Sequence, residues 1–257
     1  MSRRGGNQKE TMTRWRRLGN VWGLWPAQPI ALVEMVGGSY LAASPQLSYR
    51  RLLEGLADHN LAVHAWGYVP GFDHQAQANE AWKHLRRCRQ QLEARVGELP
   101  TPLRLGHSLG CKLHLLAPDG GRNSSALVAL SFNNFTADRS IPMLRELAPK
   151  LGFYTEFSPS PNETLRLIRE SYHQPQNLLV SFGNDSLDQS PSLLHSLQQR
   201  VEDATQSLHL PGDHLTPASA GLRQNLLGDW ADDSARAETL NQLVETISSW
   251  ASPSTRS

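Results

Sequence analysis

The alternation of short apolar runs with longer helix-like segments is the feature that most limits how this chain can fold. Each run has the length of a strand, and each intervening segment places apolar side chains at helical spacing. This order is typical of an α/β fold, in which a mostly parallel, twisted sheet carries helices on both faces. The expected strands are residues 30–36, 61–66, 103–105, 126–132, 177–182 and 205–210, and the expected helices are residues 47–57, 75–96, 109–118, 143–150, 162–172, 191–202 and 235–250.

The rhythm breaks between residues 133 and 176, where five prolines accompany two short amphipathic pieces. We expect a short lid-like insertion there (133–176), within a single domain that spans residues 15–250. A chain of 257 residues is long enough to bury one large core. Residues 1–14 are expected to form a basic, disordered leader before a first strand pair packed through Trp22 and Trp25. Residues 251–257 are expected to be a polar tail.

The charge balance argues against a protein dedicated to binding nucleic acid. The chain has 25 Lys and Arg residues against 24 Asp and Glu residues, for a formal net charge of +1, whereas such proteins usually carry a strongly basic face. Basic side chains do gather in residues 1–17. Contact of this arm with an anionic membrane surface is therefore a weaker alternative to a simple leader. Met12 is an alternative start, which would remove residues 1–11.

The sequence carries no signal for a membrane span or for export. No stretch approaches the 18 apolar residues that mark a transmembrane segment, and the N-terminal residues lack the apolar core of a secretory signal. Two cysteines, Cys88 and Cys111, are too few for a disulfide framework and suit a reducing compartment. We therefore expect a cytoplasmic protein without a transmembrane segment.

The pentapeptide Gly106-His107-Ser108-Leu109-Gly110 follows an expected strand and opens an expected helix. In this context, G-x-S-x-G places its serine on a sharp, strained turn with the hydroxyl exposed above the sheet. The two glycines are needed because a side chain at either position would clash with the adjoining helix or strand. Ser108 is the candidate nucleophile of this elbow, and a glycine-rich turn with an inert serine is the alternative.

A nucleophilic serine needs a histidine to take its proton and a carboxylate to orient that histidine. In hydrolases with this motif, the acid and then the histidine follow the serine along the chain. His214 follows the strand 205–210 and is the expected base. Asp185 and Asp188 both follow the strand 177–182, so Asp185 is the first candidate for the acid and Asp188 is the alternative.

Two backbone N–H groups are expected to form an oxyanion hole. One belongs to Leu109, directly after the serine, and the other to Ser39, in the glycine-rich turn that follows the strand 30–36. The glycines of that turn let the backbone approach a substrate closely, although a Gly-Gly pair can also be only a tight turn. The further candidates for the cleft are Gly37, Gly38, Tyr40, Asp73 and His74.

The chain lacks the motifs that would indicate a metal or nucleotide site. There is no G-x-x-x-x-G-K-[ST], no H-E-x-x-H and no C-x-x-C, and the histidines show no spacing of metal ligands. We therefore expect neither a metal nor another cofactor.

Several short segments together carry a family resemblance. They are Gly37-Gly38, ASPQLSY at 43–49, GFDH at 71–74, GHSLGCKLH at 106–114, SFNN at 131–134 and LPGDHLTP at 210–217. They resemble an uncharacterised family of cyanobacteria and chloroplasts, domain of unknown function 1350. That family looks like a branch of the α/β hydrolases, which implies this fold over residues 15–250 and implies no particular substrate.

The leading hypothesis is a serine hydrolase that acts on an ester or thioester through Ser108. The alternative is a non-catalytic protein of the same fold, which would bind a lipid-like ligand or a protein partner through its cleft.

Overall fold

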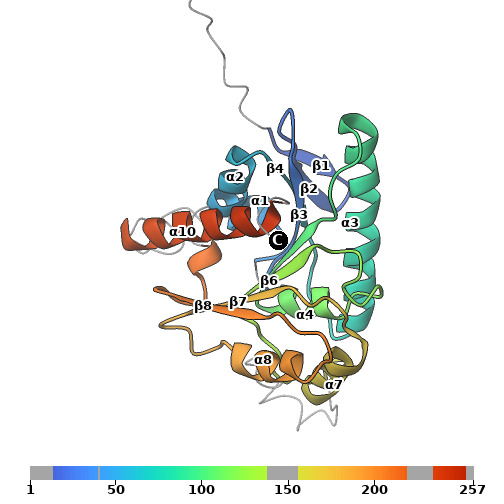
Figure 1. Cartoon of the computed structure of the whole chain (residues 1–257), viewed down its shortest axis with the longest axis vertical. Helices are drawn as coiled ribbons and strands as arrows, with labels where there is room; N and C mark the ends of the chain where they lie inside the picture. Colours follow the sequence, from blue (N-terminus) through green and yellow to red (C-terminus); the bar gives the residue numbers. More distant parts are fainter. Residues whose placement is uncertain (1–13, 40, 138–155, 219–233, 253–257) are drawn as a thin grey trace, which may run out of the picture.

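An eight-stranded sheet forms the centre of the molecule (Figure 1). The computed structural model describes residues 14–39, 41–137, 156–218 and 234–252. The strands lie in the order β1-β2-β4-β3-β5-β6-β7-β8. They are β1 (Arg16–Leu18), β2 (Val21–Leu24), β3 (Ala31–Val36), β4 (Leu61–Trp66), β5 (Leu103–His107), β6 (Ala126–Leu130), β7 (Asn177–Phe182) and β8 (Gln206–Leu210).

The strands from β3 to β8 pair in parallel, while β1 and β2 add an antiparallel edge. Parallel neighbours need long crossovers, and helices supply them here. The described helices are α1 (Pro45–Ser48), α2 (Arg50–Asp58), α3 (His74–Val96), α4 (Leu109–Leu115), α7 (Pro161–Ser171), α8 (Ser190–Gln198) and α10 (Ser234–Ala251), with a 3₁₀ turn η1 (Thr216–Ala218). The mostly parallel α/β class predicted from the alternation is confirmed.

The strands bury both faces because each face of the sheet is covered by helices (Figure 1). Side chains alternate between the two faces along a strand. Val33 and Met35 of β3 pack with α2 and α10 on one side. Val36 packs with α3 and α4 on the other side. The continuous apolar strands that the sequence shows are thus explained by burial on two faces.

The predicted helix over 47–57 is two short helices, α1 and α2, with a break at Tyr49. Tyr49 has φ −114° and ψ 21°, and its side chain is only 1% exposed. The break sends the tyrosine hydroxyl toward the sheet, where it makes two hydrogen bonds. Helical periodicity alone does not register such a long-range contact.

Part of the predicted lid-like insertion at 133–176 belongs to the helical layer. Ile168 of α7 and Tyr172 pack with Leu127 and Leu179 of the sheet. Residues 138–155 of this segment, like Tyr40, the leader residues 1–13 and the tail residues 253–257, lie outside the described residues. Within the described ranges, no helix combines the length and the apolar character that crossing a membrane requires.

Candidate active site

Ser108 lies on a strained turn between β5 and α4. Its φ of 54° and ψ of −121° are rare for a residue with a side chain. A Cβ at Gly110 would lie 1.9 Å from the carbonyl oxygen of Val36, and one at Gly106 would lie 2.6 Å from Cα of Cys111. Only glycine fits at these two positions, because any side chain would collide with neighbouring backbone. The two glycines of G-x-S-x-G therefore allow the strand and the helix to meet in this sharp turn.

Ser108, His214 and Asp185 form one chain of hydrogen bonds. Nε2 of His214 lies 3.0 Å from Oγ of Ser108, and Nδ1 of His214 lies 2.9 Å from Oδ2 of Asp185. With the proton on Nδ1 donated to the carboxylate, Nε2 accepts the serine hydroxyl proton. This is the geometry in which a histidine acts as the base for a serine.

Of the two candidate acids, Asp185 is the one bonded to His214. Its side chain is fully buried, and its other oxygen accepts the N–H of Leu187 at 2.8 Å. Burial is the strongest influence on this carboxyl and by itself raises the pKa, but hydrogen bonds, led by that from His214, prevail and lower the pKa of Asp185. Asp185 is therefore an ionised partner for the histidine.

Asp188 makes a different set of contacts. One of its oxygens accepts the backbone N–H of Ser190 at 3.0 Å and the hydroxyl of Ser190 at 2.6 Å. Ser190 is the first residue of α8, so Asp188 satisfies donors at the start of that helix. Burial raises the pKa of the Asp188 carboxyl. The structure thus separates two aspartates that the sequence left as alternatives.

Backbone contacts join the loops that carry Asp185 and His214. The N–H of Gly183 donates to the carbonyl of Leu210, and the N–H of Asn184 donates to the carbonyl of Gly212. The His214 loop is also fixed from α10, because Arg236 binds both carboxylate oxygens of Asp213, at 3.2 Å and 2.5 Å. Asp185 and His214 therefore meet through an extension of the β7–β8 pairing.

His107 links the elbow to His214 and to the turn after β3. Its Nε2 donates to the backbone carbonyl of His214 at 2.8 Å, and its Nδ1 accepts the hydroxyl of Tyr49 at 2.7 Å. The tyrosine oxygen in turn accepts the N–H of Gly38 at 2.8 Å. Burial, together with the nearby His214, lowers the pKa of His107 to about 3, so the ring is neutral. Tyr49 belongs to the segment ASPQLSY at 43–49, but the sequence does not predict its role, because both of its hydrogen bonds are made to residues distant in the chain.

The two expected oxyanion donors lie beside the same pocket. Ser39 and Leu109 both line it, and no hydrogen bond within the described residues uses either backbone N–H. Gly38 lies behind the serine, since a Cβ there would be 3.0 Å from Cβ of Ser108. A Cβ at Gly37 would meet the ring of Tyr49 at 2.6 Å. Both glycines therefore allow a close approach that a side chain would block.

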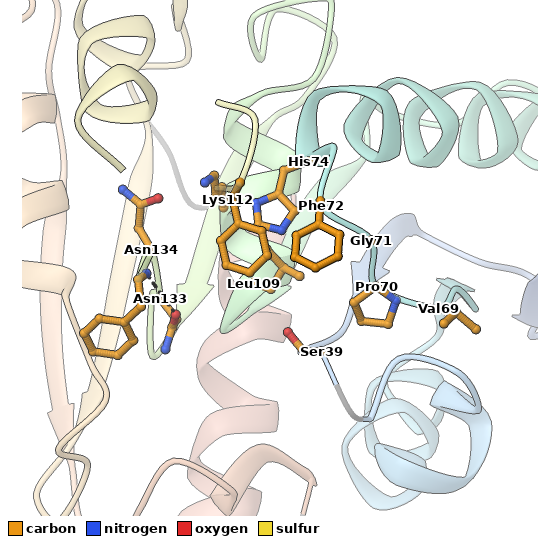
Figure 2. Close-up of a pocket in the computed structure, with 12 residues that line it drawn as sticks. Ser39, Val69, Pro70, Gly71, Phe72, His74, Leu109, Lys112, Asn133 and Asn134 are labelled. Atoms are coloured by element: carbon orange, nitrogen blue, oxygen red, sulfur yellow. Dashed lines mark hydrogen bonds between the residues drawn. The ribbon is translucent and has the colours of Figure 1, made fainter. Parts of the chain in front are cut away.

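A largely apolar pocket of about 350 Å³ opens beside these donors (Figure 2). This volume suits a small organic ligand. The loop 69–74 supplies one wall, and hydrogen bonds join it to the segment around Ser158. The pocket is lined by Ser39, Val69, Pro70, Gly71, Phe72, His74, Leu109, Lys112, Asn133, Asn134, Phe135 and Phe157.

His74 lines this pocket, but Asp73 does not belong to its lining. Asp73 is exposed and precedes α3, where its carboxylate accepts the N–H of Ala76 at 2.8 Å. Asp73 therefore caps the start of α3. No cluster of His, Cys, Asp or Glu side chains suited to a metal ion occurs in the described part of the chain.

The fold is shared with solved hydrolases of low sequence identity. Carboxyl esterase 2 of the fungus Tuber melanosporum has a TM-score of 0.65 at 15% identity, covering 96% of this chain and 89% of that chain. A monoacylglycerol lipase of Paleococcus ferrophilus has a TM-score of 0.58 at 15% identity, covering 90% of this chain and 99% of that chain. The fluorophosphonate-binding serine hydrolase F of Staphylococcus aureus has a TM-score of 0.56 at 15% identity, covering 93% of this chain and 97% of that chain. The fold is that of the α/β hydrolases.

The family is shown by the sequence itself. Residues 14–253 match the family described as Protein of unknown function (DUF1350), so the chain belongs to that family, as the motifs predicted. Among curated proteins, none matches this chain.

Proposed function

We propose that this chain is a serine hydrolase that cleaves a small ester or thioester. The observation that carries the proposal is the hydrogen-bonded series Ser108–His214–Asp185, set on a strained turn beside an apolar pocket. A positive φ at a residue with a side chain is strained, and strain of this kind is concentrated at active sites. The esterase, lipase and serine hydrolase names of the structural neighbours are in keeping with this reaction class.

The first half of the proposed reaction forms an acyl-enzyme. Oγ of Ser108 attacks the carbonyl carbon while Nε2 of His214 takes the hydroxyl proton. The negative charge that develops on the carbonyl oxygen is stabilised by the N–H groups of Ser39 and Leu109. When the tetrahedral intermediate collapses, the bond to the leaving alkoxide or thiolate breaks, and His214 returns the proton to that group.

The second half regenerates the enzyme. Water loses a proton to His214 and attacks the acyl carbon, and the bond to Oγ of Ser108 breaks as the proton returns to the serine. The carboxylate of Asp185 keeps the proton of the imidazole on Nδ1 in the resting state and stabilises the imidazolium in both halves.

A fluorophosphonate probe tests this proposal. We expect the wild-type protein to be labelled, the Ser108→Ala protein to remain unlabelled, and labelling to be retained in Ser124→Ala. Ser124 is a matched control because it is also buried and its hydroxyl donates to the carbonyl of Gly121 at 2.7 Å. Folded wild-type protein that resists the probe and hydrolyses no ester or thioester would overturn the proposal and leave a ligand-binding protein of hydrolase fold.

A further inference from the structure

The pocket lined by Ser39 and Leu109 is also lined by a buried lysine that the proposed reaction does not use. Lys112, on α4, is fully buried. Its Nζ donates to the carbonyl of Pro159 at 3.0 Å, and this is its one hydrogen bond among the described residues. An ammonium group has three donors. Two N–H groups of Lys112 therefore have no partner among the described residues, at a pocket that is otherwise mostly apolar.

No carboxylate of the described residues pairs with the ammonium group of Lys112. Within the part of the chain that the structure describes, Lys112 takes part in no ion pair. Burial alone lowers the pKa of its ammonium group to about 7. A buried charge is normally paired, because leaving water costs far more than one hydrogen bond returns. The hydrogen bond to the carbonyl of Pro159 uses one donor of Lys112, and a neutral donor could make the same bond.

A second buried polar side chain lines the same pocket. His74 is only 3% exposed, and in the part of the chain that the structure describes neither Nδ1 nor Nε2 has a hydrogen-bond partner. Its ring centroid lies 4.2 Å from that of Phe157, so the imidazole is packed against the pocket wall. Burial and the charge of Lys112 lower the pKa of His74 to about 3. The ring is therefore neutral at pH 7 and offers one donor and one acceptor.

The two side chains reach the pocket from different helices. Figure 2 shows Lys112 and His74 in the lining together with Leu109 and Ser39. Lys112 stands one helical turn after Ser108, which is about 6 Å along the axis of α4. An acyl group whose carbonyl oxygen lies at the N–H groups of Ser39 and Leu109 would occupy the pocket that Lys112 also lines.

We propose that this pocket takes an acyl group that ends in a carboxylate, so that the substrate is a monoester or monothioester of a short dicarboxylic acid. The inference rests on the proposed hydrolase function, which it makes more specific. The ammonium of Lys112 pairs with the distal carboxylate, and His74 donates its ring N–H to the same group. The apolar residues of the pocket then enclose the methylene chain between the two ends.

Matched thioesters test the preference. We would compare kcat/KM for the glutaryl thioester of N-acetylcysteamine with that for the thioester in which a carboxamide replaces the distal carboxylate. The two acyl groups have nearly the same shape and differ in charge. We expect the wild-type enzyme to favour the carboxylate at least tenfold and Lys112→Met to lose this ratio. Lys83→Met, at an exposed lysine, should keep it.

A binding measurement separates this inference from the hydrolase proposal. Glutarate is titrated calorimetrically into Ser108→Ala and into the double variant Ser108→Ala/Lys112→Met, with the monoamide of glutaric acid as the comparison ligand. We expect glutarate to bind the first protein at least tenfold more tightly than the second. Binding that depends on Lys112 without any thioester turnover would overturn the hydrolase proposal and keep the pocket assignment.

The opposite pattern overturns the pocket assignment alone. Turnover of both thioesters at equal rates, with glutarate binding unaffected by Lys112→Met, would mean that Lys112 only tethers Pro159. His74→Phe provides a second variant if Lys112→Met fails to fold, because the phenyl ring preserves the packing against Phe157. We expect His74→Phe to reduce the carboxylate preference severalfold, and an unchanged ratio in that folded protein would contradict the proposal.

Discussion

His107 and His214 are joined by a hydrogen bond from a side chain to a backbone carbonyl, at 2.8 Å and across 107 residues of sequence. Because a carbonyl can only accept, Nε2 of His107 carries the proton and Nδ1 must accept from Tyr49. The same tyrosine oxygen accepts from Gly38. The residue before the serine therefore fixes the loop of the proposed base and, through Tyr49, the turn that presents Ser39.

Removing the Tyr49 hydroxyl should affect both stability and turnover. Tyr49→Phe leaves the N–H of Gly38 and Nδ1 of His107 without a partner, so we expect the free energy of unfolding to fall by about 1–3 kcal/mol. Misplacement of His214 and Ser39 should lower kcat about tenfold. Urea denaturation and ester kinetics measure the two effects.

Tyr172→Phe is the matched control for this change. Tyr172 is also buried, and its hydroxyl donates to Asn177 at 2.9 Å. We expect a comparable loss of stability with kcat unchanged. If both variants lowered kcat equally, the effect of Tyr49 would be general destabilisation and not positioning.

The two aspartates near His214 should differ sharply in their effect on turnover. Asp185→Asn replaces the acceptor of the Nδ1 proton, and we expect kcat to fall by about 10³–10⁴. Asp188→Asn changes a group that bonds Ser190 at the start of α8, so its main effect should be on stability. Ester hydrolysis under saturating substrate compares them, and similar losses of kcat in both variants would contradict the assignment of Asp185.

The ion pair between Asp213 and Arg236 should control the placement of the base. Arg236→Met removes the bonds to the residue directly before His214, and we expect kcat to fall about tenfold, with partial recovery in Arg236→Lys. Arg166→Met is the control, since Arg166 forms exposed ion pairs with Glu163 and Glu170 on α7. An unchanged kcat in Arg236→Met would show that the other hydrogen bonds of the loop, such as those of Asp213 with Leu215 and Thr216, hold it without Arg236.

Acid should destabilise the protein well above the pH at which carboxylates protonate. Burial lowers the pKa of each of four histidines to about 3, while the unfolded value is 6.5. The unfolded chain therefore binds more protons between pH 6.5 and 3, and stability falls as pH drops through 6.5. The four histidines are His64, His74, His107 and His114. Burial also raises the pKa of Glu34 to about 7, so the folded state binds an extra proton there as pH falls, and this offsets the loss of stability from one histidine.

Urea denaturation at pH 7 and pH 5 checks this expectation, and we expect the free energy of unfolding to fall by up to about 5 kcal/mol. His64→Gln should reduce the slope of the unfolding free energy against pH by the amount that corresponds to one proton. His64 is fully buried and accepts a hydrogen bond from Trp25. His173→Gln, at an exposed histidine, should leave it unchanged. Equal stability of the wild-type protein at the two pH values would show that these histidines ionise normally.

The sequence alone predicted the fold through local patterns. Strand runs such as 61–66 and 177–182 are apolar at most positions and do not alternate strictly with polar residues, and this pattern indicates a sheet buried on both faces. The helix 75–96 was anticipated to within one residue of α3. The break at Tyr49 was missed because it depends on bonds to Gly38 and His107 and not on helical periodicity.

The elbow could also be anticipated from sequence, because its requirement for glycine is local: Gly106 and Gly110 pass too close to neighbouring backbone to carry a side chain. The chain order of serine, acid and histidine narrowed the partners to His214 and two aspartates. Which aspartate bonds the histidine was not a local matter, since both follow the same strand. Backbone hydrogen bonds between the loop after β7 and the loop after β8 bring Asp185, and not Asp188, to His214.

The sequence by itself thus determined the class of fold, the position of the elbow serine and the set of its possible partners. Tertiary structure alone decided that Asp185 meets His214, that Asp73 caps a helix, and that His74 and Lys112 line one pocket. The physical reason is the range of the interactions. Periodicity and glycine geometry act between near neighbours in the chain, whereas hydrogen bonds and buried charges are settled by residues that only folding brings together.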